Sequence, residues 1–424
     1  MSAATSLAEL VRAAKTAPDS AEPQLQAMLR DIFPALAQLS DCRINRGSKV
    51  SLNSVNGTFT AGGKDYFFKF HAEEGEQQSL QATEYYRAQL LQEQGWPVVQ
   101  PVMTSTVPGR QCVVYEKITA PTAYDLTAQL DAQFLQHGEY DANLLQRVLK
   151  AETAYLQHTT AVMLQSLQPP GATPDPEHSP LHQLFSHRLT GVNGATPRLD
   201  LFYSGQRVTM PDGSVRPFNE LATRRWVING VAHPQCLNES IALSRHLLAP
   251  VRAAEQASVI GHGDDHNGNK FLIGDAFVAF DPAFAGRHPA LLAPIKATLH
   301  NCLLHPLWYY EPEQVHDRLQ VTCAIQDETV IVTHNAAAIL HSPLRQALLK
   351  LHRELVWQPL RDALQTRGWL PQDTADYLRC AAFCCPFLAV NMLDAIRAPQ
   401  PQLSIFNLAQ CLAIFHAPAL LDGH

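Results

Sequence analysis

The sequence predicts an α+β protein with a small antiparallel sheet near the N-terminus and a large, mainly helical C-terminal part. Residues 41–120 alternate apolar and polar positions between turn residues, which is typical of strands joined by hairpins. Beyond residue 121, apolar side chains recur at three- and four-residue spacing over long stretches, which favours helices. The chain has 424 residues and 46% hydrophobic residues, enough for two or three ordered domains.

Residues 1–40 are expected to form a helical N-terminal extension. Apolar residues between positions 5 and 39 have helical spacing, and Pro18 and Pro23 are expected to separate two short helices. Residues 41–120 would then form the first lobe, which is mainly sheet with one helix over Glu76–Gln94. Its most aromatic strand contains Lys69, which either extends to solvent or points at an anion.

Residues 121–424 are expected to form a helical lobe. A long helix ends at Pro169-Pro170, and residues 169–250 form a less regular insertion with a hairpin at Pro211-Asp-Gly213. This insertion either builds a substrate pocket or extends the scaffold. After a polar loop and a short strand within residues 260–286, the remainder is expected to be helical, over about 290–310, 343–367, 372–397 and 403–415.

Charge and cysteine usage narrow the class of protein. The net charge is −7, and Lys and Arg are scattered, so no nucleic-acid partner is expected. No apolar stretch reaches the roughly 18 residues that span a membrane, so a cytoplasmic protein without a membrane partner is expected. The nine Cys lack paired C-x-x-C spacing and are expected to be reduced core thiols, including Cys380, Cys384 and Cys385.

The polar loop His262-Gly-Asp-Asp-His-Asn-Gly-Asn269 concentrates two Asp, two His and two Asn between apolar runs. Burying such a cluster is costly unless a ligand compensates it. Three parts of the chain together suit phosphoryl transfer from ATP: a strand Lys followed by a helix Glu, the loop's Asp and Asn, and Asp281 at the end of the next strand. A triphosphate needs cations and metal held on oxygen ligands, while a carboxylate receives the acceptor's proton.

These residues resemble the aminoglycoside phosphotransferase family, small-molecule kinases that share the protein-kinase fold. The loop completes the family's H-G-D-x-H-x-x-N pattern, and Phe280-Asp281-Pro282 is similar to its strand-ending metal-binding segment. The match is strong over residues 258–286 and moderate over 43–118. The resemblance implies a two-lobed protein-kinase-like fold, ATP and Mg²⁺ as cofactors, and a small-molecule hydroxyl as acceptor.

The resemblance also implies a role for each matching position. Asp264 would be the catalytic base, and Asn269 with Asp281 would bind magnesium. The nucleotide would be bound by Lys69 paired with Glu84, by the Gly47-Ser48 turn, and by the segment from Glu116 to Ile118. Two departures are present: the chain has no G-x-G-x-x-G motif, and Pro282 rather than Phe follows Asp281, which argues against an activation switch of the protein-kinase type.

The acceptor is expected beside Asp264 and the helices that follow Asp281. A sugar, an aminoglycoside-like antibiotic, an amino alcohol and a nucleoside all remain open. Aromatic and charged side chains suit such acceptors, and the candidates are His305, Trp308, Tyr309, Tyr310, Glu311, Arg224, Arg225 and Trp226. The alternative is that at least two of the residues Trp308 to Tyr310 pack in the helical core.

Two other functions compete with the kinase. His262, Asp264 and His266 could hold Zn²⁺ in a metal-dependent hydrolase, but this explains neither Asn269 nor Asp281. In the kinase interpretation His262 instead braces the loop. A nucleotide-binding pseudokinase is the other alternative, although no catalytic position is lost from the motif.

Overall fold

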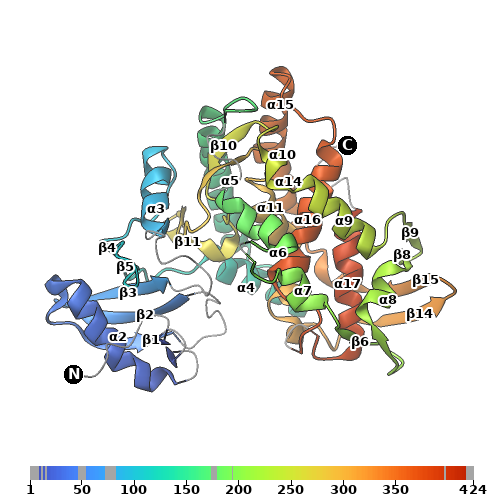
Figure 1. Cartoon of the computed structure of the whole chain (residues 1–424), viewed down its shortest axis with the longest axis horizontal. Coiled ribbons are helices and arrows are strands. Elements are labelled where there is room, and N and C mark those ends of the chain that lie inside the picture. The colour runs from blue at the N-terminus through green and yellow to red at the C-terminus, as the bar shows by residue number, and fades with distance from the viewer. Residues whose placement is uncertain are drawn as a thin grey trace. The chain divides into compact units, whose positions relative to one another are not determined.

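The chain divides into two compact units. The structure, a computed structural model, describes residues 9–10, 13–14, 17–45, 54–71, 83–172, 179–192, 194–395 and 398–416. One unit, here called the sheet unit, comprises Met1–Glu93, Val98–Ala120 and Asp281–Ala283. The other, the helical unit, comprises Gln94–Pro97, Pro121–Phe280 and Phe284–His424. Figure 1 labels many of the helices and strands of both units.

The sheet unit is built on a five-stranded antiparallel sheet in the order β1-β2-β3-β5-β4. Its ladders pair Lys69 of β3 with Asn56 of β2 on one side and with Val113 of β5 on the other. The predicted antiparallel sheet with one helix after its third strand is therefore confirmed. Its elements are α2 (Pro18–Ile32), η1 (Pro34–Leu36), β1 (Ser40–Ile44), β2 (Ser54–Ala61), β3 (Lys64–His71), α3 (Thr83–Glu93), β4 (Met103–Ser105) and β5 (Cys112–Glu116).

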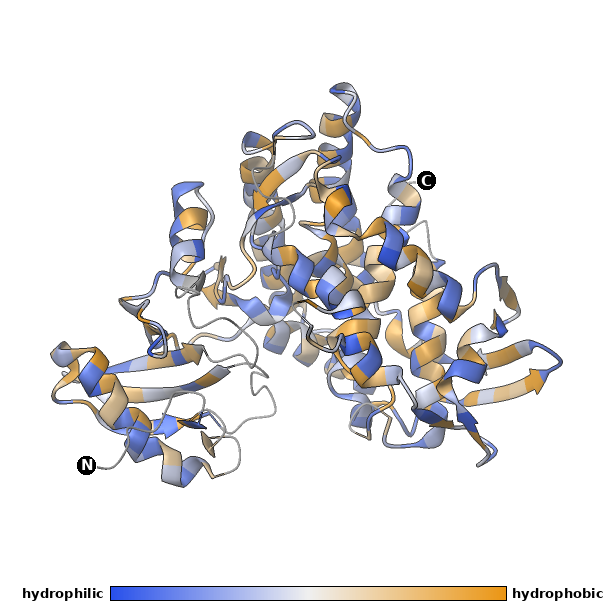
Figure 2. Ribbon diagram, viewed as in Figure 1, coloured by the Kyte–Doolittle hydropathy of each residue, from blue (hydrophilic) through white to orange (hydrophobic). Residues whose placement is uncertain are grey.

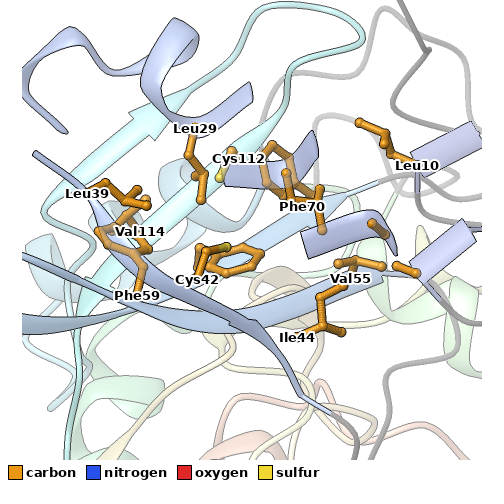
Figure 3. Packing of buried hydrophobic residues seen from close by; sticks show 14 of the residues in the cluster. Leu10, Leu29, Leu39, Cys42, Ile44, Val55, Phe59, Phe70, Cys112 and Val114 are labelled. Carbon is orange, nitrogen blue, oxygen red and sulfur yellow. The ribbon is translucent and has the colours of Figure 1, made fainter. Parts of the chain in front are cut away.

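The helix α2 packs its apolar face on this sheet. Leu25 and Leu29 are fully buried in one cluster with side chains of β1, β2, β3 and β5, and Figure 3 shows Leu29 among Cys42, Cys112 and Val114. The expectation that Pro23 separates two helices is wrong, because Pro23 lies inside α2. Burial of the leucine face stabilises the helix by more than the one backbone hydrogen bond that a proline removes.

The first half of the helical unit alternates helices with short strands. The predicted long helix before Pro169 is present as α5, and the predicted hairpin around Pro211 is present as β6 and β7. The elements are α4 (Ala123–His137), α5 (Ala142–Gln165), η3 (Pro180–Leu184), α6 (Ser186–Thr190), α7 (Arg198–Tyr203), β6 (Arg207–Thr209), β7 (Val215–Pro217), α8 (Phe218–Thr223), β8 (Arg225–Ile228), β9 (Val231–His233), α9 (Leu237–Leu247), α10 (Pro250–Ala253), β10 (Ser258–Gly261), η4 (Asn267–Asn269), β11 (Lys270–Ile273) and β12 (Ala276–Ala279).

The second half is mostly helical, as expected, and its helices are largely buried. Figure 2 shows α17 in mainly hydrophobic colours, in agreement with its buried residues. The elements are β13 (Gly286–Pro289), α11 (Ile295–Cys302), α12 (Pro306–Tyr309), η5 (Pro312–Gln314), β14 (Val321–Gln326), β15 (Thr329–His334), α13 (Ala336–Leu340), α14 (Pro343–His352), a π-helical turn η6 (Arg353–Trp357), α15 (Gln358–Thr366), α16 (Thr374–Ala389) and α17 (Pro401–Phe415).

The helical unit contains a four-stranded sheet that is not predicted from the sequence, since β14 and β15 lie between the predicted helical ranges 290–310 and 343–367. Its order is β14-β15-β8-β9, and β8 runs parallel to β15, with Arg225 opposite Thr329. The β-branched run Thr329-Val-Ile-Val-Thr333 favours a strand. Its partner β8 lies about 100 residues earlier in the chain, so the pairing leaves no local pattern in the sequence. The sheet also shows that part of the 169–250 region belongs to the scaffold.

The cysteines form no disulfide among the described residues, and eight of the nine are buried as core side chains, while Cys323 is half-buried. Cys380, Cys384 and Cys385 lie on α16, inside the helical unit. Among the residues that the structure describes, no helix has the length and apolar character needed to cross a membrane.

Candidate active site

The polar loop follows a strand that is buried at every position. β10 pairs antiparallel with β13, with Ser258 opposite Pro289 and Gly261 opposite Gly286. After the loop, β11 and β12 form a tight hairpin in which Lys270 faces Ala279. Both ends of the loop are therefore held by strand pairing, as its apolar flanks predict.

His262 holds the two ends of the loop region together. Its Nδ1 accepts a hydrogen bond from the backbone N–H of Asp264 at 3.3 Å, and its Nε2 lies 3.1 Å from the carbonyl oxygen of Phe280. With Nδ1 as acceptor, Nε2 carries the proton and donates to that carbonyl. Because backbone groups occupy both ring nitrogens, His262 acts as a brace here and is not a metal ligand.

The zinc alternative finds no further support. Within the described part of the chain, no group of three or more His, Cys, Asp or Glu side chains is arranged to hold a metal ion. The ring of His266 also has a local partner, since its Nδ1 accepts from the N–H of Gly268 at 3.0 Å.

Gly263 permits the turn that follows His262. Its φ is +79°, a left-handed conformation that side chains with a Cβ rarely adopt, and a Cβ would collide with the carbonyl oxygen of Phe284. The second residue of the loop motif is therefore required by backbone geometry.

Asp264 is buried, with 8% of its surface exposed, and it contacts a cation. The Nζ of Lys296 on α11 touches its Oδ1, and the Nε2 of His266 lies 3.6 Å from the same atom. Burial alone would raise the pKa of Asp264, but Lys296 and the neighbouring histidines lower it below its ordinary value. Burial lowers the pKa of His266 to about 4 against the pull of Asp264. At neutral pH the site therefore holds an ionised carboxylate beside a neutral imidazole.

Asn269 is oriented by the same loop. Its side-chain Nδ2 donates to the backbone oxygen of Asp264 at 2.9 Å, and its backbone oxygen accepts from the N–H of Phe280 at 2.9 Å. Because Nδ2 donates to the Asp264 backbone, the side-chain Oδ1 of Asn269 points away from that backbone. An amide oxygen held in this way is a suitable ligand for Mg²⁺.

A buried ion pair anchors the strand that follows Asn269. Lys270 and Glu152 of α5 are almost fully buried, with 0% and 1% of their surfaces exposed, and the Lys270 Nζ lies 2.9 and 2.7 Å from the two carboxylate oxygens. His352 adds a contact of 3.4 Å to Glu152. Burial would raise the pKa of Glu152, but Lys270 and His352 hold it at about 2. The pair therefore ties β11 to the long helix beneath it.

In the sheet unit, Lys69 and Asp281 are in contact. Lys69 is buried, with 8% of its surface exposed, and its Nζ touches the carboxylate of Asp281. Asp281 has a left-handed φ of 55°, a conformation that Asp adopts more readily than most residues. Nearby, the guanidinium of Arg87 on α3 donates to the carbonyl oxygen of Ala283. The strand lysine is therefore directed at an anion rather than at solvent.

The structure says less about the other residues that were predicted to bind the nucleotide. Gly47, Ser48 and the side chain of Glu84 lie outside the described residues, so the expected pairing of Lys69 with Glu84 stays a prediction. Glu116 is exposed at the end of β5 and lies 3.3 Å from the Nζ of Lys64. Ile118 is half-buried in the segment that follows.

Two of the aromatic acceptor candidates pack in the helical core, as the alternative interpretation expects. Trp308 is 3% exposed and donates its indole N–H to Asn407 at 2.9 Å, and Tyr309 is 2% exposed. Tyr310 is half-buried, and its hydroxyl lies 2.6 Å from the Nδ1 of His300. The His300 ring stacks on His266 at 5.5 Å, so Tyr310 is linked to the loop through two imidazoles.

The charged acceptor candidates already have partners in the helical unit. Arg224 pairs with Glu220, and Arg225 pairs with Glu239 at 2.7 Å. The remaining three are also engaged: the buried Trp226 donates to Leu221, His305 caps α12 and lies 3.3 Å from Asp131, and Glu311 accepts from the Tyr124 hydroxyl at 2.8 Å. These contacts within the protein explain the positions of all five side chains, so none of them needs a bound acceptor substrate as a partner.

Sequence reasoning missed two cations beside Asp264. Lys296 directly follows an apolar run, Ala290-Leu-Leu-Ala-Pro-Ile295, and a lone charge at the end of such a run is the signal that the sequence offers. Arg188 on α6 interacts electrostatically with Asp264 and Lys296. Its position within the irregular 169–250 region carries no comparable signal.

Several solved structures are similar to this chain. An amicoumacin kinase in complex with AMP-PNP, Ca²⁺ and Ami is 14% identical with a TM-score of 0.46, over 93% of this chain and 96% of that one. A thermostable mutant of aminoglycoside phosphotransferase APH(4)-Ia in a ternary complex with ADP and hygromycin B is 10% identical with a TM-score of 0.42, over 92% and 97%. An ethanolamine kinase of Plasmodium vivax is 12% identical with a TM-score of 0.40, over 94% and 90%. No protein-family model and no curated protein sequence matches the chain.

Proposed function

We propose that this protein is a small-molecule kinase that transfers the γ-phosphate of ATP to a hydroxyl group. The observation that carries this proposal is the braced loop: an ionised, buried Asp264 and an oriented Asn269 lie on one turn, joined by a hydrogen bond of 2.9 Å. A base and a metal ligand held together in this way suit phosphoryl transfer, in which catalysis consists mainly of positioning and charge stabilisation.

The residues have separate tasks in the proposed reaction. Asp264 accepts the proton of the acceptor hydroxyl as its oxygen forms a bond to the γ-phosphorus, while the bond from that phosphorus to the β-phosphate oxygen breaks. His262 keeps the Asp264 backbone in place. Lys69 would meet the negative charge of the nucleotide phosphates, and the segment from Glu116 to Ile118 would border the adenine.

Asn269 and Asp281 fit a magnesium ion by the chemistry of their donor atoms. Each offers an oxygen, and the backbone bond between Phe280 and Asn269 keeps the residue before Asp281 beside Asn269. When bound, Mg²⁺ neutralises phosphate charge. The fit favours the kinase over the zinc hydrolase, which would need the ring nitrogens that His262 has already committed to the backbone.

A thermal-shift comparison tests this proposal directly. Mg-ATP should raise the unfolding midpoint, because a ligand that binds only the folded state stabilises it. Zn²⁺ alone should leave the unfolding midpoint unchanged. Stabilisation by Zn²⁺ but not by Mg-ATP would contradict the kinase. The acceptor class would then be sought by screening sugars, aminoglycosides and amino alcohols for acceptor-dependent ADP release, with Asp264→Ala as the blank.

A further inference from the structure

Positive charge gathers around Asp264. Lys296 contacts the Asp264 carboxylate directly, and its Nζ lies 6.0 Å from the centre of the Phe284 ring. Arg188, half-buried on α6, interacts electrostatically with Asp264 from another element. Arg198 on α7 adds a third cation that acts on Arg188. Two cations from different helices, Lys296 and Arg188, therefore act on the Asp264 carboxylate, and a third lies close to Arg188.

The packing of α16 explains how these cations come together. Lys296 lies on α11, which packs against α16 and against η4 of the loop. α16 also packs against η3, which leads into α6 and Arg188. Cys385 on α16 interacts electrostatically with both Lys296 and Arg188. The two cations thus belong to one region of the helical unit beside the loop.

The charges in this region do not balance. Among the described residues, the Arg188 guanidinium makes no hydrogen bond and no ion pair with a carboxylate, so the Asp264 carboxylate acts on both cations. Arg198 adds further positive charge. His300 and Cys385 add none at neutral pH, because burial lowers the pKa of His300 well below its ordinary value and raises the pKa of Cys385 to about 12. A half-buried guanidinium that shares one carboxylate with a lysine is incompletely neutralised, and an anionic ligand would offset the cost of burying it.

We propose that the acceptor is a hydroxyl compound with an anionic group, a carboxylate or a phosphate ester, which Lys296 and Arg188 bind while its hydroxyl faces Asp264. This inference rests on the proposed kinase function and names its substrate class. The anionic group keeps its bonds throughout: the acceptor oxygen bonds to the γ-phosphorus, its proton passes to Asp264, and ADP leaves. A cationic amino-sugar would be repelled by the same two residues.

A matched set of acceptor sugars distinguishes the effect of acceptor charge on activity from the effect of acceptor shape. Glucose, glucosamine, glucuronate and glucose 6-phosphate share one ring and differ in charge, and acceptor-dependent ADP release is measured for each at saturating Mg-ATP. Greater kcat/KM for either anionic sugar than for glucose and glucosamine supports the proposal, and the two anions tell carboxylate from phosphate. Equal or greater kcat/KM for glucosamine overturns it.

Arg188→Gln tests the residue itself. Because a hydrogen bond to a charged group contributes substantially to binding, KM for the preferred anionic acceptor should rise by roughly 10- to 100-fold, with kcat and KM for ATP nearly unchanged. Arg188→Lys should recover part of the loss. Arg225→Gln is the matched control, because Arg225 already pairs with Glu239. A rise in KM for ATP alone, or an equal effect of the control, would overturn the assignment.

A binding measurement decides the matter if none of the four sugars is a substrate. With AMP-PNP and Mg²⁺ saturating, inorganic phosphate should raise the unfolding midpoint of the wild type and not that of Arg188→Gln. No phosphate effect in the wild type, or the same effect in both proteins, overturns the anionic site. Failure of AMP-PNP itself to stabilise the wild type would instead refute the kinase function, so the two failures are distinguishable.

Discussion

The buried pair of Lys270 and Glu152 yields the most demanding prediction, tested by Lys270→Met. Methionine has a similar length and no charge, so the variant leaves the Glu152 carboxylate buried without its main partner. Removing one member of a buried pair costs about 3–5 kcal/mol. The 3.4 Å contact from His352 to Glu152 offsets part of this, so about 3 kcal/mol is expected.

Urea unfolding followed by tryptophan fluorescence measures this loss of stability in the helical unit, which contains the ion pair. All five tryptophans, at positions 96, 226, 308, 357 and 369, lie in the helical unit, as does the ion pair. The double variant Lys270→Met/Glu152→Gln should recover stability relative to Lys270→Met, because it no longer buries an unpaired carboxylate. A loss below about 1 kcal/mol for Lys270→Met, or no recovery in the double variant, would refute the argument.

Three further predictions concern the loop and its supports. Gly263→Ala should destabilise the helical unit by at least about 1–2 kcal/mol in the same urea assay, since it combines a left-handed φ with a clash against Phe284; a neutral effect would contradict the backbone argument. The pKa of Glu152 is depressed to about 2, so its stabilisation is complete above the unfolded value of 4.5 and is lost as the pH falls. The stability difference between wild type and Glu152→Gln should therefore shrink by about 2 kcal/mol between pH 5 and pH 3, and a constant difference would argue against it. Asp281→Ala should weaken the magnesium dependence of nucleotide binding in a titration followed by thermal shift, whereas an unaltered titration would exclude Asp281 as a ligand.

The sequence predicts well those features that depend on residues close together in the chain. The loop motif, the strand carrying Lys69 and the hairpin at Pro211 follow from local spacing and turn chemistry. The family resemblance also implied that His262 braces the loop, and its ring lies beside the carbonyl oxygen of Phe280, the residue after β12.

What sequence missed depends on contacts between distant segments. β8 and β15 pair across about 100 residues, and Pro23 is tolerated because α2 buries its leucines on the sheet. Lys296 meets Asp264 because α11 packs against η4 of the loop, and Arg188 belongs to the same region because α16 packs against both α11 and η3. Arg224 and Arg225 looked equally suitable as acceptor ligands in sequence, and only the structure reveals that glutamates already pair with them.

The central claim is that Asp264 serves as the base of an ATP-dependent phosphotransferase. Its most direct test compares acceptor-dependent ADP release by wild type and Asp264→Asn at saturating Mg-ATP, since the amide keeps the shape of the side chain but cannot accept the proton. Turnover should fall by about 10²–10⁴ while ATP binding is retained. Unchanged turnover in Asp264→Asn would contradict the account.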